Sequence, residues 1–123
     1  MKKIFFILML IPGILHAKSL YPERHYQKIW CDEQGGEAEV YMPDRTWCDC
    51  LTDTHAVEVD FARKWYESLS QSLHYSVQTG KRPGVVLIFE KESDQRYLDR
   101  LNKVLQHYDC LEVDVWVDAI SQP

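Results

Sequence analysis

The sequence predicts a single α/β domain with a mixed sheet of about five strands. Two kinds of segment support this prediction: short ones that alternate apolar and polar residues, and longer ones with apolar residues at helical spacing. They follow one another in the order helix, three strands, helix, strand, helix, strand. Strands that alternate with helices along a chain form a sheet covered by helices, so one α/β domain is expected.

Residues 1–17 have the pattern of a secretory signal peptide, with two lysines at the start and an apolar segment over residues 4–15. Ala17 ends an acceptable cleavage site. The apolar segment is shorter than the ~20 residues that a spanning helix needs; the alternative interpretation is an uncleaved anchor. We therefore expect a periplasmic or secreted domain over residues 18–123, with no stable membrane association after cleavage.

The first helix and three strands are predicted in the half of the chain that follows the signal. The helix is expected over residues 21–34 and the strands over 37–42, 46–51 and 56–60. Pro22 suits the first turn of a helix, and two consecutive glycines stop it. The strands are separated by turn residues, Pro43-Asp44-Arg45 and Thr52-Asp53-Thr54-His55.

The second of these turns places two acidic residues opposite each other. With Asp53 and Thr54 as the central turn residues, Asp49 pairs with Glu58 on one face, with Cβ atoms ~5 Å apart. Like charges in that position destabilise a sheet, so the pair is expected either to be solvated or to bind a cation. The opposite face is expected to carry Cys48, Cys50, Val57 and Val59.

A third carboxylate depends on the length of the preceding loop. A three-residue loop at Pro43-Asp44-Arg45 places Glu39 beside Asp49, whereas a two-residue loop places Val40 there. Glu37 is another candidate for the third acid. Three carboxylates across neighbouring strands suit Mg²⁺ or Mn²⁺, because these ions prefer oxygen ligands.

In the second half of the chain, a helix is expected from residue 61 to residue 77, followed by a strand over 85–90 that is parallel to the third strand. A helix over 93–107 and a last strand over 111–117 complete the predicted elements. The first of these helices has two stripes. Its apolar stripe contains Phe61, Trp65, Leu69, Leu73 and Val77, and its polar stripe contains Lys64, Ser68, Gln71 and Tyr75. The polar stripe is expected to approach the two acidic residues.

Four cysteines remain after the signal, and an even number in an exported chain favours disulfides. We prefer Cys31 bonded to Cys48 or Cys50. A zinc site is the alternative, although Cys-x-Cys lacks the usual ligand spacing. Removing the signal leaves 12 basic and 19 acidic residues, a net charge of −7. An acidic surface repels phosphate, so no broad nucleic-acid-binding face is expected.

The acidic pair and the helix that follows it resemble the PD-(D/E)xK, or restriction-endonuclease-like, nuclease superfamily over roughly residues 23–90. Asp49 and Glu58 match its two strand carboxylates, and Gln71 and Tyr75 match a Gln-x-x-x-Tyr helix motif. The resemblance implies an αβββαβ core, followed here by an extra helix and strand. It also implies a divalent metal on Asp49, Glu58 and, in our interpretation, Glu39. The superfamily often contributes a Glu from its first helix, so the resemblance makes Glu23 the other candidate for the third acid. The departure is Asp60, which stands where the superfamily has lysine.

The resemblance implies a role for each of these residues. Lys64 is the substitute for the missing lysine and would orient the attacking water or stabilise charge. Gln71 and Tyr75 would position the backbone of a nucleic acid, the implied partner. Two hypotheses stay open: an exported metal-dependent phosphodiesterase, and a non-catalytic binding or structural domain that keeps the fold. The sequence does not identify a protein partner.

Overall fold

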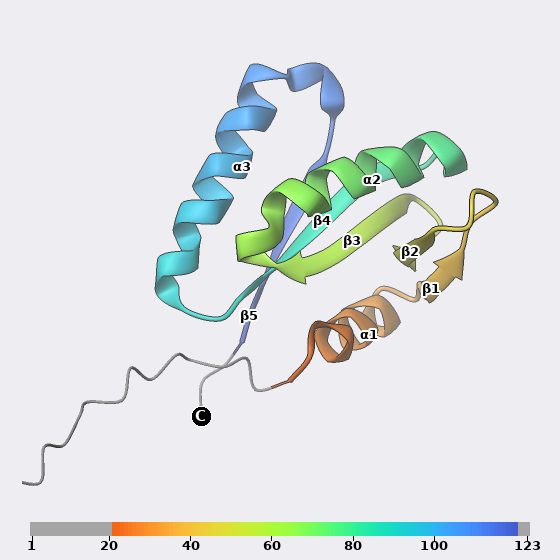
Figure 1. The fold of residues 1–123 in the computed structure, drawn as a ribbon, viewed down its shortest axis with the longest axis horizontal. Coiled ribbons are helices and arrows are strands. Elements are labelled where there is room, and N and C mark those ends of the chain that lie inside the picture. The colour runs from red at the N-terminus through yellow and green to blue at the C-terminus, as the bar shows by residue number, and fades with distance from the viewer. Residues whose placement is uncertain (1–20, 121–123) are drawn as a thin grey trace, which may run out of the picture.

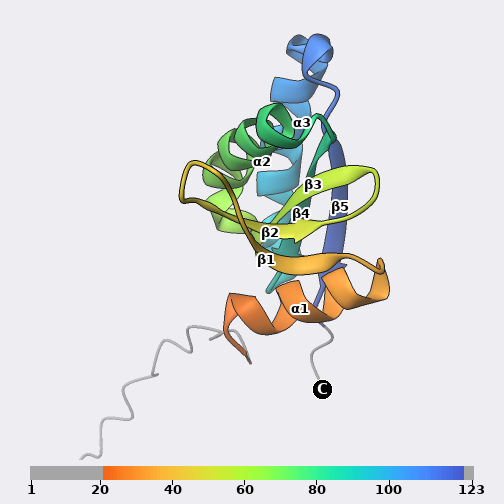
Figure 2. The same cartoon turned by 90° about the vertical axis from the view of Figure 1, so that its right-hand side faces the viewer.

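The computed structural model describes residues 21–120, and the predicted signal peptide lies outside them. One five-stranded sheet separates two helical layers (Figures 1 and 2). The helices are α1 (Glu23–Glu33), α2 (Trp65–Thr79) and α3 (Gln95–His107). The strands are β1 (Glu37–Tyr41), β2 (Trp47–Leu51), β3 (His55–Phe61), β4 (Arg82–Phe89) and β5 (Asp114–Ala119).

The strands lie in the sheet in chain order, β1 to β5. The β1–β2 and β2–β3 pairs are antiparallel, whereas β3–β4 and β4–β5 are parallel and are joined through α2 and α3. Helix α1 covers one face, and α2 and α3 cover the other (Figure 2). The predicted fold class, a single α/β domain with a mixed sheet of five strands, is confirmed.

Several predicted boundaries were wrong. Strand β4 begins at Arg82 rather than at residue 85, and short 3₁₀ turns precede α2 and β5. Ala62–Lys64 forms such a turn, so α2 begins at Trp65 and continues to Thr79, where Gly80 ends it with a left-handed φ of 69°. The turn Asp109–Leu111 delays β5 to Asp114, and Glu112 after it has a φ of 46°. Left-handed backbone stops regular elements, so both boundaries have a local cause.

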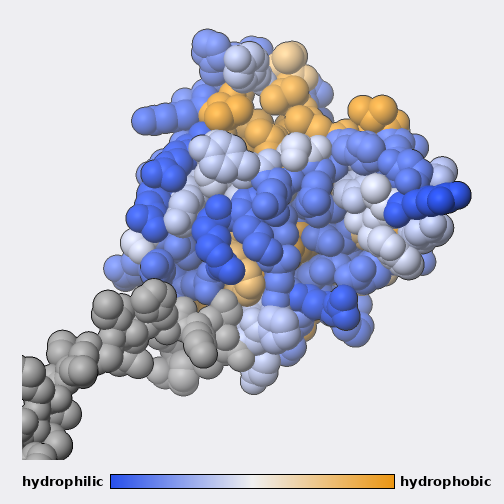
Figure 3. Space-filling view, viewed as in Figure 1, coloured by the Kyte–Doolittle hydropathy of each residue, from blue (hydrophilic) through white to orange (hydrophobic). Residues whose placement is uncertain are grey.

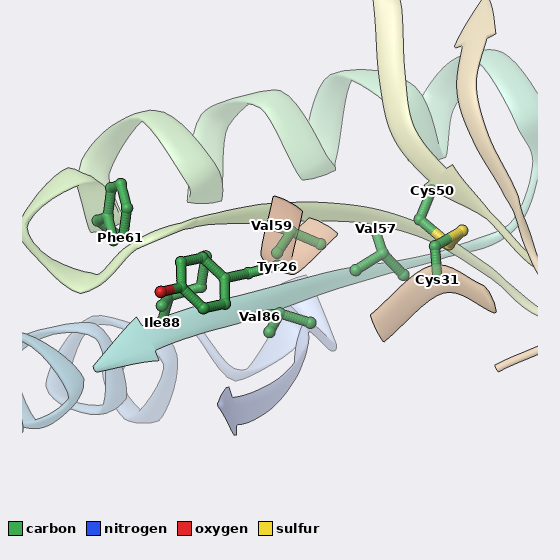
Figure 4. Packing of buried hydrophobic residues seen from close by; sticks show 8 residues of the cluster. All are labelled: Tyr26, Cys31, Cys50, Val57, Val59, Phe61, Val86 and Ile88. Carbon is green, nitrogen blue, oxygen red and sulfur yellow. A yellow bond between two sulfur atoms is a disulfide. The ribbon is translucent and has the colours of Figure 1, made fainter. Parts of the chain in front are cut away.

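The core on the α1 side is made of apolar residues from α1, β2, β3 and β4 (Figure 4). Val57, Val59 and Phe61 alternate along β3 toward α1, and Cys31 of α1 is bonded to Cys50 of β2. One of the two preferred disulfides is thus confirmed. The disulfide runs beside Gly36, where an added Cβ would lie 2.7 Å from the Cys50 sulfur.

The other face of β3 is polar although it is buried. Its alternate residues are Ala56, Glu58 and Asp60, and both acids are at most 6 % exposed. Parallel sheets with both faces covered normally carry apolar strands, so two buried acids in β3 are an exception that needs a chemical reason. Helix α2 lies over this face.

The predicted apolar stripe of α2 is correct only in its first part, where Phe61 and Trp65 are buried and Leu69 packs against the core. Val77 is 85 % exposed, and the residues that α2 turns inward are Trp65, Ser68, Ser72 and Tyr75. The helix is rotated from the predicted phase because it faces a row of carboxylates rather than a purely apolar sheet. Small hydroxyl side chains fit that surface and can donate hydrogen bonds to it.

Cys48 is also placed differently from the prediction. It packs with Met42, Ala56 and Tyr75, on the α2 side, while Cys50 packs on the α1 side. Strand β2 therefore does not keep a regular alternation between these two residues.

Figure 3 shows hydrophilic side chains over most of the α2 side, with a hydrophobic group near the end of α3. Within residues 21–120, no helix is long and apolar enough to cross a membrane.

Candidate functional site

Three carboxylates from two neighbouring strands converge beneath α2. Asp49 of β2 and Glu58 and Asp60 of β3 each place one carboxylate oxygen within 4.8 Å of the others. Asp60 lies two residues beyond Glu58, so strand alternation puts both on one face. The predicted proximity of Asp49 and Glu58 is confirmed.

The hairpin has the register that the turn residues predicted. Cys50 pairs with Val57 and Leu51 with Ala56, and the Thr52 N–H donates to the His55 carbonyl at 2.9 Å. The next position, Asp49 opposite Glu58, has side-chain hydrogen bonds in place of the regular ladder.

The Asp49 N–H donates to Glu58 Oε1 at 3.3 Å, and the Val59 N–H donates to Asp49 Oδ2 at 2.9 Å. Each of the two carboxylates therefore accepts a hydrogen bond from the backbone of the opposite strand. A side chain held by a backbone donor has little rotational freedom, so these oxygens are fixed in position before any ligand binds.

Asp60 is held by α2. The fully buried Ser68 hydroxyl donates to Asp60 Oδ2 at 2.6 Å. Glu23 of α1 reaches the same end of β3, where its Oε2 accepts from the Phe61 N–H at 3.2 Å. The site is thus assembled from β2 and β3, with α2 and α1 supporting it from either side.

All three carboxyl groups have raised pKa values. Burial, followed by the negative charge of Asp49, raises the pKa of Glu58 to about 10. Burial raises the pKa of Asp60 to about 7, opposed by the Ser68 hydrogen bond and reinforced by Glu23. Burial raises the pKa of Asp49 to about 6, opposed by the Val59 N–H. The negative charge of Asp60 also raises the pKa of Glu58.

Lys64 does not form an ion pair with any of the three carboxylates. Its Nζ lies 3.2 Å from Glu23 Oε2. Within residues 21–120, no lysine, arginine or histidine forms an ion pair with Asp49, Glu58 or Asp60. Lys64 therefore does not lower the pKa values of these carboxyl groups, because its charge is paired with Glu23.

The two predicted helix-motif residues have different environments. Tyr75 is buried against Cys48 and Ala56, and burial together with nearby Glu58 and Asp49 raises its pKa. Gln71 is exposed. The inward surface of α2 passes through Ser68, Ser72 and Tyr75, so Gln71 lies at its border rather than over the acids.

Glu39 is outside the group of three. The three-residue loop is confirmed, since Val40 pairs with Cys48 and the Met42 N–H donates to the Thr46 carbonyl at 2.8 Å. However, Glu39 has a φ of 56°, and its carboxylate accepts from Gln27 Nε2 at 3.1 Å on the α1 side. Asp60 therefore takes the third place that we had assigned to Glu39.

Gln27 is a supporting residue that the sequence pattern did not indicate. It is 5 % exposed, and its Nε2 also donates to the Asp49 carbonyl at 2.9 Å. One amide thus bridges β1 and β2 where Glu39 has left-handed backbone. No spacing rule relates a helix glutamine to two strands. By contrast, the Glu-x-Asp spacing in β3 indicates that Asp60 lies on the same face of the strand as Glu58.

The three acids form a donor set suited to a hard divalent cation. All the donor atoms are oxygens, they are fixed by backbone or serine donors, and no side-chain cation among residues 21–120 neutralises them. Buried like charges are costly unless they are protonated or bind a metal. The chain matches no protein-family model, no curated protein and no solved structure.

Proposed function

We propose that this chain is a divalent-metal-dependent phosphodiesterase that acts on nucleic acid, with Asp49, Glu58 and Asp60 as the metal ligands. The observation that carries the proposal is the convergence of these carboxylates within 4.8 Å. The element order from α1 to β4 supports the resemblance to the PD-(D/E)xK nucleases, whose core is αβββαβ.

Mg²⁺ or Mn²⁺ held by these residues would polarise a phosphoryl oxygen and lower the pKa of a water molecule. The protein's own contribution is to fix the ligands. The Val59 N–H orients Asp49, and the Ser68 hydroxyl orients Asp60. Such support limits the movement of the carboxylates when substrate arrives.

Three further residues have proposed roles next to the ligands. Lys64, bound to Glu23 at 3.2 Å, brings the positive charge that lies beside the Asp60 end of the site and would stabilise charge on a bound phosphate. The buried Tyr75 of α2 lies near Glu58, and the exposed Gln71 offers its amide to a nucleic-acid backbone at the border of that helix.

A hydrolysis assay tests this proposal. Wild-type protein is expected to cleave single-stranded or duplex DNA or RNA with Mg²⁺ or Mn²⁺, and chelation of the metal should stop the reaction. The rate of hydrolysis is expected to fall by about a hundredfold or more in Asp49→Asn and in Asp60→Asn, because each change removes a metal ligand. Glu67→Gln, an exposed change on α2, is the matched control and should retain full activity.

Lys64→Ala separates a catalytic from a structural role for that lysine. It should lose hydrolysis while the melting temperature changes little, since surface substitutions normally cost under ~0.5 kcal/mol. Lys103→Ala, an exposed change on α3, is the control. Equal activity of Lys64→Ala and wild type would remove Lys64 from the mechanism.

The second candidate function is a non-catalytic binding or structural domain that keeps the nuclease-like fold. The observation that favours it is the pairing of Lys64 with Glu23, combined with Asp60 at the position where the superfamily has lysine. This candidate predicts that the protein cleaves neither DNA nor RNA, single-stranded or duplex, whether or not it binds Mn²⁺.

A further inference from the structure

A hollow lies on the α1 side of the sheet, between the first half of α1 and the end of β5. It has a volume of about 260 Å³. Its walls include Tyr21, His25, Tyr26, Ile29, Asp118 and Ile120. Glu58 and Asp60 project from the opposite face of the sheet, so this hollow is separate from the carboxylate group described above.

Aromatic rings form one wall of the hollow. The rings of Tyr21 and His25 are stacked, with centroids 4.2 Å apart, and Tyr26 meets both of them edge-on. Tyr21 is 52 % exposed, so its ring is open to a ligand. The faces of aromatic rings carry negative electrostatic potential and attract cations.

The opposite wall carries the carboxylate of Asp118. Within residues 21–120, Asp118 makes no ion pair and no hydrogen bond through its side chain. Burial raises the pKa of Asp118, and the negative charge of Glu33 raises it further. A half-buried carboxylate is costly without a partner, and a bound cation would remove that cost.

The remaining walls suit an aliphatic chain. Ile29 and Ile120 are apolar, and Ile29 is 46 % exposed. The Tyr26 hydroxyl is buried and has no hydrogen-bond partner among the described residues. A volume of about 260 Å³ lies just below the ~300 Å³ of ordinary ligand pockets, so the hollow fits a group the size of one long side chain.

We propose that this hollow binds an organic cation of the alkylammonium class, with Asp118 as the counter-ion and the rings of Tyr21 and Tyr26 against the cation. The alkyl chain lies against Ile29 and Ile120. A free amine and the lysine side chain of a peptide share this chemistry. The proposal does not rest on the metal site or on hydrolysis.

Chemical-shift titration of ¹⁵N-labelled protein at pH 7 tests the proposal, with butylammonium and Nα-acetyl-lysine methylamide as the two cations. Saturable shifts are expected at the start of α1 and the end of β5. Butanol, which has the same chain without the charge, should leave them unchanged. The tighter of the two cations identifies the source, a free amine or a peptide lysine.

Variants locate the binding. Asp118→Asn and Tyr21→Ala should each lower the affinity for butylammonium by about fivefold or more. The first change removes the counter-ion, and the second removes an aromatic ring that contacts the cation. Asp109→Asn, an exposed change outside the hollow, should bind like wild type. Asp60→Asn should also bind like wild type, which separates this site from the carboxylate group.

Three results would overturn the proposal: equal shifts with butanol, unchanged affinity in Tyr21→Ala, or loss of binding in Asp60→Asn. Tyr21 is half exposed at the edge of the described chain, so Tyr21→Ala provides a decisive test even if Asp118→Asn fails to fold.

Discussion

Replacing Glu58 by glutamine is expected to stabilise the metal-free protein at neutral pH. Glu58 is 3 % exposed, and burial beside Asp49 raises its pKa to about 10. The unfolded chain releases this proton near pH 4.5, whereas the folded protein retains it. The free energy of unfolding that depends on the Glu58 proton is therefore fully present below pH 4.5, and it is lost as the pH rises toward the pKa of the folded protein.

The magnitude follows from the interval between the two pKa values. Each pH unit above 4.5 costs about 1.4 kcal/mol, so the penalty at pH 7 approaches ~3 kcal/mol. Glutamine is neutral in both states and keeps an Oε1 acceptor for the Asp49 N–H, so it removes this penalty. An increase of ~3 kcal/mol corresponds to a rise of roughly 10 °C or more in melting temperature.

Urea unfolding at pH 4 and pH 7 in the presence of a chelator measures the effect. The free energy of unfolding of Glu58→Gln should exceed that of wild type at pH 7 and match it at pH 4. Glu67→Gln, the same chemical change at an exposed position of α2, should match wild type at both pH values. A Glu58→Gln protein that is less stable than wild type at pH 7 would refute the claim that this buried acid is destabilising.

Two further predictions concern the α1 side of the sheet. The double variant Cys31→Ser/Cys50→Ser should lose ~3 kcal/mol of unfolding free energy, because the disulfide closes a loop with a sequence separation of 19 residues. Urea unfolding measures this loss against exposed Cys110→Ser, and an unchanged midpoint in the double variant would contradict it. Gly84→Ala should cost ~1–3 kcal/mol, since its Cβ would lie 2.7 Å from the Trp116 ring and 3.1 Å from Val57. A thermal melt equal to that of wild type would show that Trp116 moves aside freely.

Much of the fold could be predicted from the sequence because local patterns determine it. The turn Thr52-Asp53-Thr54-His55 lies between two alternating segments, and its length sets the register that brings Asp49 to Glu58. The apolar segment of β4 likewise indicated a buried strand parallel to β3.

The orientation of α2 could not be predicted in the same way. Its leucines and Val77 form a regular apolar stripe, yet Ser68 and Ser72 are the residues turned to the sheet. The reason is tertiary: the surface beneath α2 contains Glu58 and Asp60, and Ser68 donates a hydrogen bond to Asp60. A hydrophobic periodicity rule assumes an apolar partner surface, which α2 has only at its start, where Trp65 and Leu69 pack with Val85 and Leu87.

The third acid and the partner of Lys64 depended on side-chain directions that spacing does not determine. Left-handed backbone at Glu39 turns that carboxylate toward Gln27, so strand register alone misplaced it. Lys64 was within reach of the acids in sequence terms, but Glu23 from a helix 41 residues earlier takes its charge. Contacts between distant elements of this kind become visible only in the folded chain.

Calorimetric titration with Mn²⁺ at pH 7.5 tests most directly whether Asp49, Glu58 and Asp60 hold a divalent cation. We expect one saturable site in wild type and in Glu67→Gln. In Asp60→Asn, affinity for Mn²⁺ should fall by about tenfold or more, as is typical when a metal site loses ligand support. Wild-type protein that takes up no Mn²⁺, or an Asp60→Asn protein that binds it as tightly as wild type, would show that these carboxylates do not form a metal site.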